Sequence, residues 1–439
     1  MDILVKTGQL LLSLSILVVI HELGHFTLAK IFKTRVEKFY LFFNPWFSLF
    51  KYKKGETEYG VGWVPLGGYV KISGMIDESM DTESLKQPPQ PWEFRSKPAW
   101  QRLLIMVGGV LVNFIAALLI YWMLLYSNGE QYIPVSNAKY GLYFTELAHE
   151  IGLKDGDVVK KADNYPVEAI EDITKYIILE EAQTLSVKRG DSTLTINIPK
   201  GYTQRLISEG KKGFANIQIP FVIDSVVPGN PASLAGFIKG DSIISINNQP
   251  AGYYHQFVGI IGNYKNQEVT ITVKRDTAIL DLLCKVTENG KIGVGNKPIT
   301  EYFQIKTLEY GFWAACPAGI KKGFSILYNY VRQLKLIFTK EGIKQVGGFG
   351  TIGSLFLPVW DWVAFWSLTG LLSIILAFMN ILPIPALDGG HVMFLLYEMI
   401  TGKKPGDKFM EYAQITGMLI LLTLLVYANG NDIIRFFFR

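Results

Sequence analysis

A chain of 439 residues is long enough for several domains, and its 49% hydrophobic content and mean hydropathy of +0.23 favour a membrane protein with water-soluble insertions over a purely soluble protein. The net charge of +5 is modest and no basic run is interleaved with aromatic residues, so we expect no nucleic-acid partner. Cys284 and Cys316 are the only cysteines, too few for a disulfide framework or a cysteine-based zinc site. Any zinc ligands would therefore be histidine and carboxylate side chains.

The first apolar stretch, residues 8–29, is a predicted membrane-spanning helix with the motif His21-Glu22-Leu-Gly-His25 near its end. No small-residue cleavage site follows, so we expect a retained helix rather than a signal peptide. On a helix, His21 and His25 lie one turn apart on one face, where both imidazoles can reach the same tetrahedral Zn²⁺. Glu22 lies beside them and could take a proton from the attacking water and pass it to a leaving amine. Such residues are costly in a membrane helix, which favours a metal site over a merely polar helix end.

The second apolar stretch, residues 103–126, is long enough to cross about 30 Å of hydrocarbon. The loop between the two stretches is rich in lysine and arginine, so the positive-inside rule places it in the cytoplasm. Lys403, Lys404 and Lys408 place a later loop on the same side. Both termini and a long insert, residues 127–360, are then expected to face outward, with the His-Glu motif near the cytoplasmic face.

Residues 59–72 of the cytoplasmic loop alternate apolar and small side chains, which predicts a β-hairpin whose glycines permit tight turns. Non-helical backbone is tolerated at membrane depth only where protein or a watery cavity satisfies it. An exposed strand edge beside a zinc site could hold an unwound substrate by strand addition. An ordinary cytoplasmic hairpin fits the pattern equally well.

The outward insert contains a weak internal repeat. Residues 148–159 and 230–247 each place a small helix, a Gly-Asp turn and an apolar-alternating strand in the same order. The pattern resembles PDZ domains, degenerate in the first copy, and predicts two α+β PDZ-like domains at residues 127–210 and 211–300. These would hold an extended peptide or a chain end in a groove, and bulky spacers are the alternative. We expect the insert's histidines, His149 and His255, on the surface.

The connector at residues 301–360 is amphipathic and punctuated by glycines. Within it, residues 320–339 predict a helix along the outer membrane surface, and residues 345–353 are too glycine-rich for a regular element. Two more predicted spans follow at residues 362–382 and 412–428. The fourth is short for a span, so it is expected either to tilt little or to extend into the interface.

The predicted fold is therefore a polytopic α-helical membrane protein with about four transmembrane helices, a membrane-associated β-hairpin, and two PDZ-like domains inserted between helices two and three. Residues 1–126 and 361–439 form its membrane parts. The second and fourth spans contain almost no ionisable residues, which argues against a metal transporter.

Catalytic zinc needs a third protein ligand and an open position for water, and Asp388 is the candidate. It follows Pro383 and Pro385, which break the third helix, and precedes two glycines, so its carboxylate would project from non-helical backbone at the cytoplasmic end. The alternative is that Asp388 caps a helix starting near Gly390. His391 is expected to orient a ligand or simply to begin this helix. Glu398, on the same helix, is expected to face the cytoplasmic interface.

The His-Glu motif in a first span, together with Asn380-x-x-Pro-x-Pro-x-Leu-Asp388-Gly after a third, resembles the site-2 protease family of intramembrane zinc metalloproteases. The PDZ-like pair between spans two and three is similar to the bacterial RseP-type members, so the resemblance covers nearly the whole chain. It implies His21, His25 and Asp388 as zinc ligands and Glu22 as the general base. It also implies that Asn380 positions the substrate backbone, since a side-chain amide can donate and accept.

The resemblance extends to two further segments. Residues 62–70 match the family's membrane-entering β element, which makes Gly67, Gly68 and Tyr69 candidate substrate-binding residues. Gly108-Gly109 and Asn113 match a small-residue packing segment in the second span.

The implied function is cleavage of transmembrane segments of single-pass proteins within a bacterial inner membrane. Implied substrates are anti-sigma factors already shortened outside by another protease, and signal-peptide remnants; the lipid bilayer is the other partner. The alternative is a non-proteolytic zinc-site scaffold or receptor that uses its PDZ pair, for which Glu22→Gln would keep biological activity.

Overall fold

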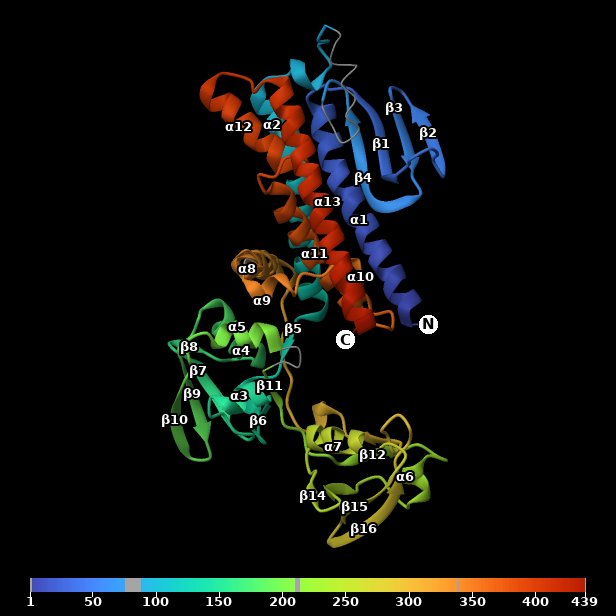
Figure 1. Cartoon of the computed structure of the whole chain (residues 1–439), viewed down its shortest axis with the longest axis vertical. Helices are drawn as coiled ribbons and strands as arrows, with labels where there is room; N and C mark the ends of the chain where they lie inside the picture. The colour runs from blue at the N-terminus through green and yellow to red at the C-terminus, as the bar shows by residue number, and fades with distance from the viewer. Residues whose placement is uncertain (1, 76–87, 210–213, 338, 439) are drawn as a thin grey trace. The chain divides into compact units, whose positions relative to one another are not determined.

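The computed structural model describes residues 2–75, 88–209, 214–337 and 339–438 (Figure 1). The chain divides into two compact units, one made of Met1–Gly129 with Glu309–Arg439 and the other of Glu130–Leu308. The first unit carries the apolar helices and the second carries most of the strands, as expected of a membrane protein with an inserted β-rich region.

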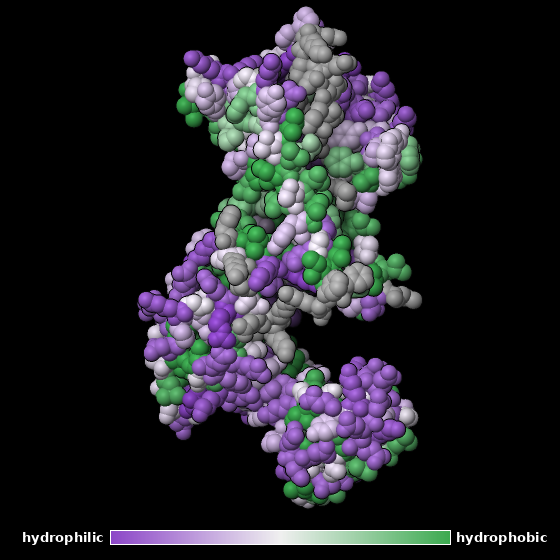
Figure 2. Space-filling model, viewed as in Figure 1, coloured by the Kyte–Doolittle hydropathy of each residue, from purple (hydrophilic) through white to green (hydrophobic). Residues whose placement is uncertain are grey.

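Four helices are long and apolar enough to cross a membrane: α1 (Asp2–Ile31), α2 (Ala99–Asn128), α11 (Trp362–Ile381) and α13 (Asp407–Phe438). They confirm the four predicted spans. Both chain ends lie near one end of these helices, and the β1–β4 sheet and α12 lie near the opposite end (Figure 1). Figure 2 shows apolar residues gathered over the middle of this helical unit.

Of the two expectations for the fourth span, the structure shows the extension, because α13 continues through polar residues beyond the apolar run. Asn429 and Asp432 accept hydrogen bonds from the backbone N–H groups of Phe349 and Gly348, and Asp432 also accepts from both the N–H and the hydroxyl of Thr351. These bonds hold the start of α10 (Phe349–Ser354), a short helix where the sequence predicted no regular element. The helix forms because side chains about 80 residues later in the chain accept hydrogen bonds from the unpaired backbone N–H groups of its first turn.

Helix α2 is the centre of the first unit, since it packs on α1, α8 (Phe312–Ile337), α11 and α12 (Asp388–Thr401). Small residues permit these approaches: a Cβ on Gly319 of α8 would lie 2.6 Å from the backbone nitrogen of Trp122. This packing explains why α8 begins at Phe312, ahead of the predicted start at 320. Trp313, Phe324 and Tyr328 remain exposed along α8.

The strands of the loop between α1 and α2 form a four-stranded sheet in the order β2-β3-β1-β4, with bounds β1 (Val36–Phe43), β2 (Phe50–Lys54), β3 (Thr57–Val61) and β4 (Val64–Ile72). The predicted hairpin of residues 59–72 is wrong in its pairing, because β1 lies between β3 and β4. It pairs parallel with β3 and antiparallel with β4. Gly62, whose N–H donates to Leu41 O, makes the crossover tight enough for this arrangement. Strand β4 is left at the edge of the sheet, next to α1.

The second unit contains the same arrangement twice. A four-stranded sheet in the order β10-β9-β7-β8 is followed along the chain by one in the order β14-β13-β15-β16, each with a helix after its first hairpin. Each half has its own apolar core. The predicted boundary at residues 210–211 lies outside the described residues. The elements are β5 (Glu130–Tyr132), β6 (Leu142–Phe144), α3 (Glu146–Glu150), β7 (Val158–Ala162), β8 (Tyr165–Pro166), α4 (Ile170–Leu179), β9 (Thr184–Arg189), β10 (Ser192–Asn197), α5 (Tyr202–Glu209), β11 (Ala215–Ile217), β12 (Ile223–Val226), α6 (Pro231–Leu234), β13 (Ser242–Ile246), β14 (Gln249–Pro250), α7 (Tyr254–Ile261), β15 (Glu268–Arg275), β16 (Ala278–Lys285), β17 (Val294–Asn296) and β18 (Lys306–Leu308).

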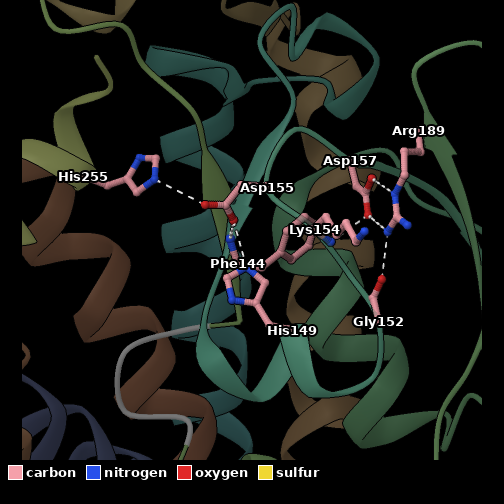
Figure 3. Close-up of polar contacts among 8 residues, drawn as sticks. All are labelled: Phe144, His149, Gly152, Lys154, Asp155, Asp157, Arg189 and His255. Atoms are coloured by element: carbon pink, nitrogen blue, oxygen red, sulfur yellow. Dashed lines mark hydrogen bonds and ion pairs between the residues drawn. The ribbon is translucent and has the colours of Figure 1, made fainter. Parts of the chain in front are cut away.

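The same ion pair recurs in both halves. Arg189 Nη2 lies 2.7 Å from the buried Asp157 carboxylate and donates to Gly152 O (Figure 3). In the second half Arg275 Nε lies 2.8 Å from Asp241, and Arg275 also donates to a glycine carbonyl. Each pair ties the Gly-Asp turn to the end of a long strand, so the turn that the sequence repeat predicted has a structural purpose in both copies.

The two histidines of this unit flank Asp155. His149 Nε2 lies 3.0 Å from one carboxylate oxygen and His255 Nε2 lies 3.6 Å from the other (Figure 3). His149 is exposed as predicted, but the His255 ring stacks on Tyr143 with centroids 4.0 Å apart and its side chain is only 18% exposed. The expectation of a surface His255 is wrong, because the stack on Tyr143 covers the ring.

Candidate metal centre

His21 and His25 lie on one face of α1, as the spacing predicts, and the helix continues unbroken to Ile31. Their rings meet edge to face with centroids 4.8 Å apart. Both residues are buried, with 9% and 6% of their surface exposed. Buried imidazoles in an apolar helix need polar partners, and these come from two other helices.

Asp388 is the first residue of α12, and Leu387 occupies the N-cap position, so Asp388 does not cap the helix. Between α11 and α12 the chain turns through Pro383, Pro385 and Ala386, whose φ is +83°. Gly390 packs directly on this turn, since a Cβ there would lie 2.6 Å from Pro385 Cα. The prolines and the glycine thus fold the segment back so that the carboxylate points at α1.

The three side chains meet at one point. Asp388 Oδ2 lies 3.2 Å from His21 Nε2 and 3.4 Å from His25 Nε2, and the two Nε2 atoms are 3.2 Å apart. Ligands at about 2.0–2.1 Å from a tetrahedral Zn²⁺ are about 3.3 Å from one another, which matches this triangle. Within the described part of the chain, these three side chains form the group that could hold a metal ion.

The other hydrogen bonds of His25 and Asp388 are consistent with a metal ion between them. His25 Nδ1 lies 2.8 Å from Ile105 O, so Nδ1 carries the proton and Nε2 keeps its lone pair. Asp388 Oδ2 is buried and accepts no hydrogen bond from the described residues. A buried carboxylate oxygen without a donor is costly, and a cation at the centre of the triangle would satisfy it. Two imidazoles and a carboxylate suit Zn²⁺ and leave a fourth position for water.

Glu22 lies next to the triangle without joining it. Helix α1 packs on β4 here, with Glu22 close to Val70. Gly68 permits this approach, since a Cβ there would lie 3.5 Å from Glu22 Cγ and 2.7 Å from the side chain of Val18. The position is that of a base beside a metal ion rather than that of a ligand.

A cavity of about 480 Å³ opens onto these residues. Three residues of β4 were predicted to bind substrate. Gly68 and Tyr69 line this cavity, whereas Gly67 is absent from its described lining. The Tyr69 ring stacks between Tyr40 and Phe43, and its hydroxyl donates to Asn44. The cavity is therefore bounded by the metal-ligating residues on one side and the edge strand β4 on the other.

Asn380 and His391 also line the cavity. Asn380 Nδ2 lies 3.3 Å from His21 Nε2, so the structure brings together the helix-borne residues that the sequence predicted for the site. Sequence reasoning missed Gln414 of α13, which lines the same cavity and accepts a hydrogen bond from Ala386 N at 3.1 Å. The sequence signal that could have identified Gln414 is its amide side chain within an otherwise apolar span.

Comparison with known proteins covers nearly the whole chain. The profile of peptidase family M50 matches residues 9–424. A regulator of sigma E protease from Haemophilus influenzae is 27% identical over 463 aligned positions, which cover 99% of this chain and all of the relative. A putative zinc metalloprotease from Vibrio cholerae is 26% identical with 99% of both chains covered. The regulator of sigma-E protease RseP from Escherichia coli is 26% identical with 98% of both chains covered.

Proposed function

Because this chain belongs to peptidase family M50 and is a membrane metalloprotease that uses zinc, we propose that it cuts peptide bonds inside the transmembrane segments of single-pass membrane proteins. The observation that carries the proposal is where the His21, His25 and Asp388 triangle lies. Two of the ligands belong to a helix able to span a membrane, and the third follows another such helix directly. A protease with its metal ligands on such helices meets its substrate at membrane depth.

His21, His25 and Asp388 would hold the zinc, and Glu22 would handle protons. Bound Zn²⁺ supplies the Lewis acidity that makes water a nucleophile near neutral pH. Glu22 accepts the proton from the attacking water and returns it to the nitrogen of the leaving amine. Glu22 and Val70 line the cavity in which the peptide carbonyl would lie.

The substrate must be unwound, since a helical segment buries its carbonyls in its own hydrogen bonds. Among the described strands β4 pairs only with β1, so its other edge can accept an extended segment by strand addition. Gly68 and Tyr69 lie where that edge meets the cavity, and Asn380 lies across from them on α11. These three residues would compensate the backbone groups that unwinding exposes. Gly67, with φ of +155°, would shape the strand rather than touch the substrate.

The proposed setting is a bacterial inner membrane, with the loop carrying β1–β4 in the cytoplasm. The loop's excess of basic residues supports this orientation, in which the termini and the inserted unit would face the outer side. The insert would act as two PDZ-like domains that filter substrates by size or bind a new chain end. Relatives named as regulators of sigma E protease support anti-sigma factors as substrates, with signal-peptide remnants as a second class.

The test is to map the cleaved bond. The purified chain in proteoliposomes is incubated with a tagged single-pass protein whose outer domain has been shortened. The masses of the products are measured by mass spectrometry to identify the cleaved bond. We expect a cut within the apolar segment that disappears on chelation, returns with added Zn²⁺, and is absent for Glu22→Gln. A cut confined to water-exposed residues, or one that survives in Glu22→Gln, would refute intramembrane cleavage by this site.

A further inference from the structure

The amide of Asn113 lies behind the metal centre, on the Nδ1 side of His21. Asn113 belongs to α2 and is completely buried. Its Nδ2 atom lies 3.4 Å from His21 Nδ1, and its Oδ1 atom accepts no hydrogen bond from the described residues. A buried amide in an apolar membrane helix needs all its hydrogen bonds, so this oxygen requires a donor.

The His21 ring has the complementary need. To present a lone pair from Nε2 to a metal ion, neutral imidazole must carry its proton on Nδ1, and that N–H needs an acceptor. With the Asn113 nitrogen facing Nδ1, the proton would instead have to lie on Nε2, the wrong tautomer for a ligand. A half-turn of the amide exchanges its oxygen and nitrogen, which have nearly the same shape. The orphaned oxygen then accepts from His21 Nδ1–H, which satisfies this oxygen and the N–H of the ring.

The surrounding face of α2 supports this arrangement. Ile105, Gly109 and Asn113 follow one another at four-residue intervals, so they lie on one face of the helix. Ile105 O is the acceptor for His25 Nδ1. Gly109 leaves room for both rings, since a Cβ there would overlap His25 Nε2 and lie 2.7 Å from His21 Cε1. One helix face thus provides an acceptor for each imidazole and a gap between them.

We infer that Asn113 is a positioning residue of the metal site, whose Oδ1 fixes the His21 tautomer and ring orientation required for zinc binding. The inference rests on the zinc site of the proposed function. It assigns to Asn113 a role in metal affinity in place of the packing role that its neighbours Gly108 and Gly109 suggest.

The test compares two substitutions of nearly equal shape in the purified full-length chain. Asn113→Leu removes the acceptor, whereas Asn113→Asp keeps an oxygen that can accept from His21 Nδ1–H. Zinc affinity is measured by competition with a chromophoric chelator, and the absorption spectrum of the Co²⁺-substituted protein reports the ligand geometry. We expect about 10- to 100-fold weaker zinc binding for Asn113→Leu, and wild-type affinity within a few-fold for Asn113→Asp.

Ser373→Ala is the matched control. The Ser373 hydroxyl donates to the backbone carbonyl of Asn113 at 2.7 Å, so its loss loosens the α2–α11 contact without touching the amide. It should lower the melting temperature and leave zinc affinity unchanged. If Asn113→Leu does not fold, Asn113→Ala provides a smaller variant without the acceptor.

Equal zinc affinity in the wild type and a folded acceptor-free variant would overturn the inference. Equal loss in Asn113→Asp and Asn113→Leu would overturn it too, because it would indicate a requirement for shape alone. A wild-type chain that binds no zinc would refute the metal site itself, and the role of Asn113 with it.

Discussion

Gly24 of α1 and Gly108 of α2 lie against each other where the two helices cross, so closely that a Cβ on Gly24 would overlap the carbonyl oxygen of Gly108. A Cβ on Gly108 would in turn lie 2.8 Å from Gly24 O. The contact is immediately beside His25, whose Nδ1 reaches back to Ile105 on the same face of α2. The glycine inside the His-Glu motif therefore sets the helix spacing on which the proposed metal site would depend.

Gly24→Ala should push the helices apart and weaken the site. Overpacking of this kind costs about 1–3 kcal/mol of stability, and the displaced His25 loses its acceptor. Gly8→Ala in the same helix is the matched control, because nothing lies within 4 Å of a Cβ there. The melting temperature and zinc content of both variants are measured in detergent, and both should be lower for Gly24→Ala than for Gly8→Ala. A Gly24→Ala protein indistinguishable from Gly8→Ala would contradict the tight crossing.

Arg102 and Glu398 form a nearly buried ion pair between α2 and α12, with 2.5 Å between Nη2 and Oε1 and side chains 9% and 14% exposed. Glu398 therefore does not point out to the interface as its sequence position predicted. Glu398→Ala leaves the Arg102 charge buried without its partner and should lower stability by about 3–5 kcal/mol. The double variant Arg102→Met with Glu398→Leu should recover most of this loss when unfolding is followed in denaturant. An equally unstable double variant would show that the pair itself, rather than the unpaired charge, matters.

His255 should make the inserted unit less stable in acid. Burial lowers the pKa of His255 below its ordinary value, and the nearby Asp155 carboxylate only partly opposes this effect. The folded protein thus prefers the neutral ring, so the stability contributed by its burial is complete above a pH of about 6.5 and is lost as the pH falls toward the lowered pKa. His255→Phe keeps a ring to stack on Tyr143 but removes the titration. Melting temperatures at pH 7.5 and 5.5 should differ less for His255→Phe than for the wild type, and an identical difference would refute this role.

The features that the sequence could predict are those that depend on residues close together along the chain. Four apolar runs predicted four helices, and the spacing of His21 and His25 predicted two ligands on one face. Asp388 could be proposed as their partner because prolines and glycines around a carboxylate at membrane depth are hard to explain otherwise. Chemistry and hydropathy were enough for these features.

The parts that the sequence could not predict depend on residues distant along the chain. Strand β1 separates β3 from β4 because pairing is decided by which strands meet in space, and no local pattern reports this. The short helix α10 exists because Asn429 and Asp432 hold its amides. The sequence predicts a packing role for Asn113, and only the fold brings its amide beside His21.

We propose that His21, His25 and Asp388 hold the zinc while Glu22 only moves protons. The most direct test is the zinc-to-protein ratio, measured together with substrate cleavage on the same purified samples of wild type, Glu22→Gln and Asp388→Ala. We predict about one Zn²⁺ per chain in the wild type and in Glu22→Gln, with cleavage at least about 100-fold slower in the latter, and neither zinc nor cleavage in Asp388→Ala. Full zinc and cleavage in Asp388→Ala, or loss of zinc in Glu22→Gln, would contradict this division of roles.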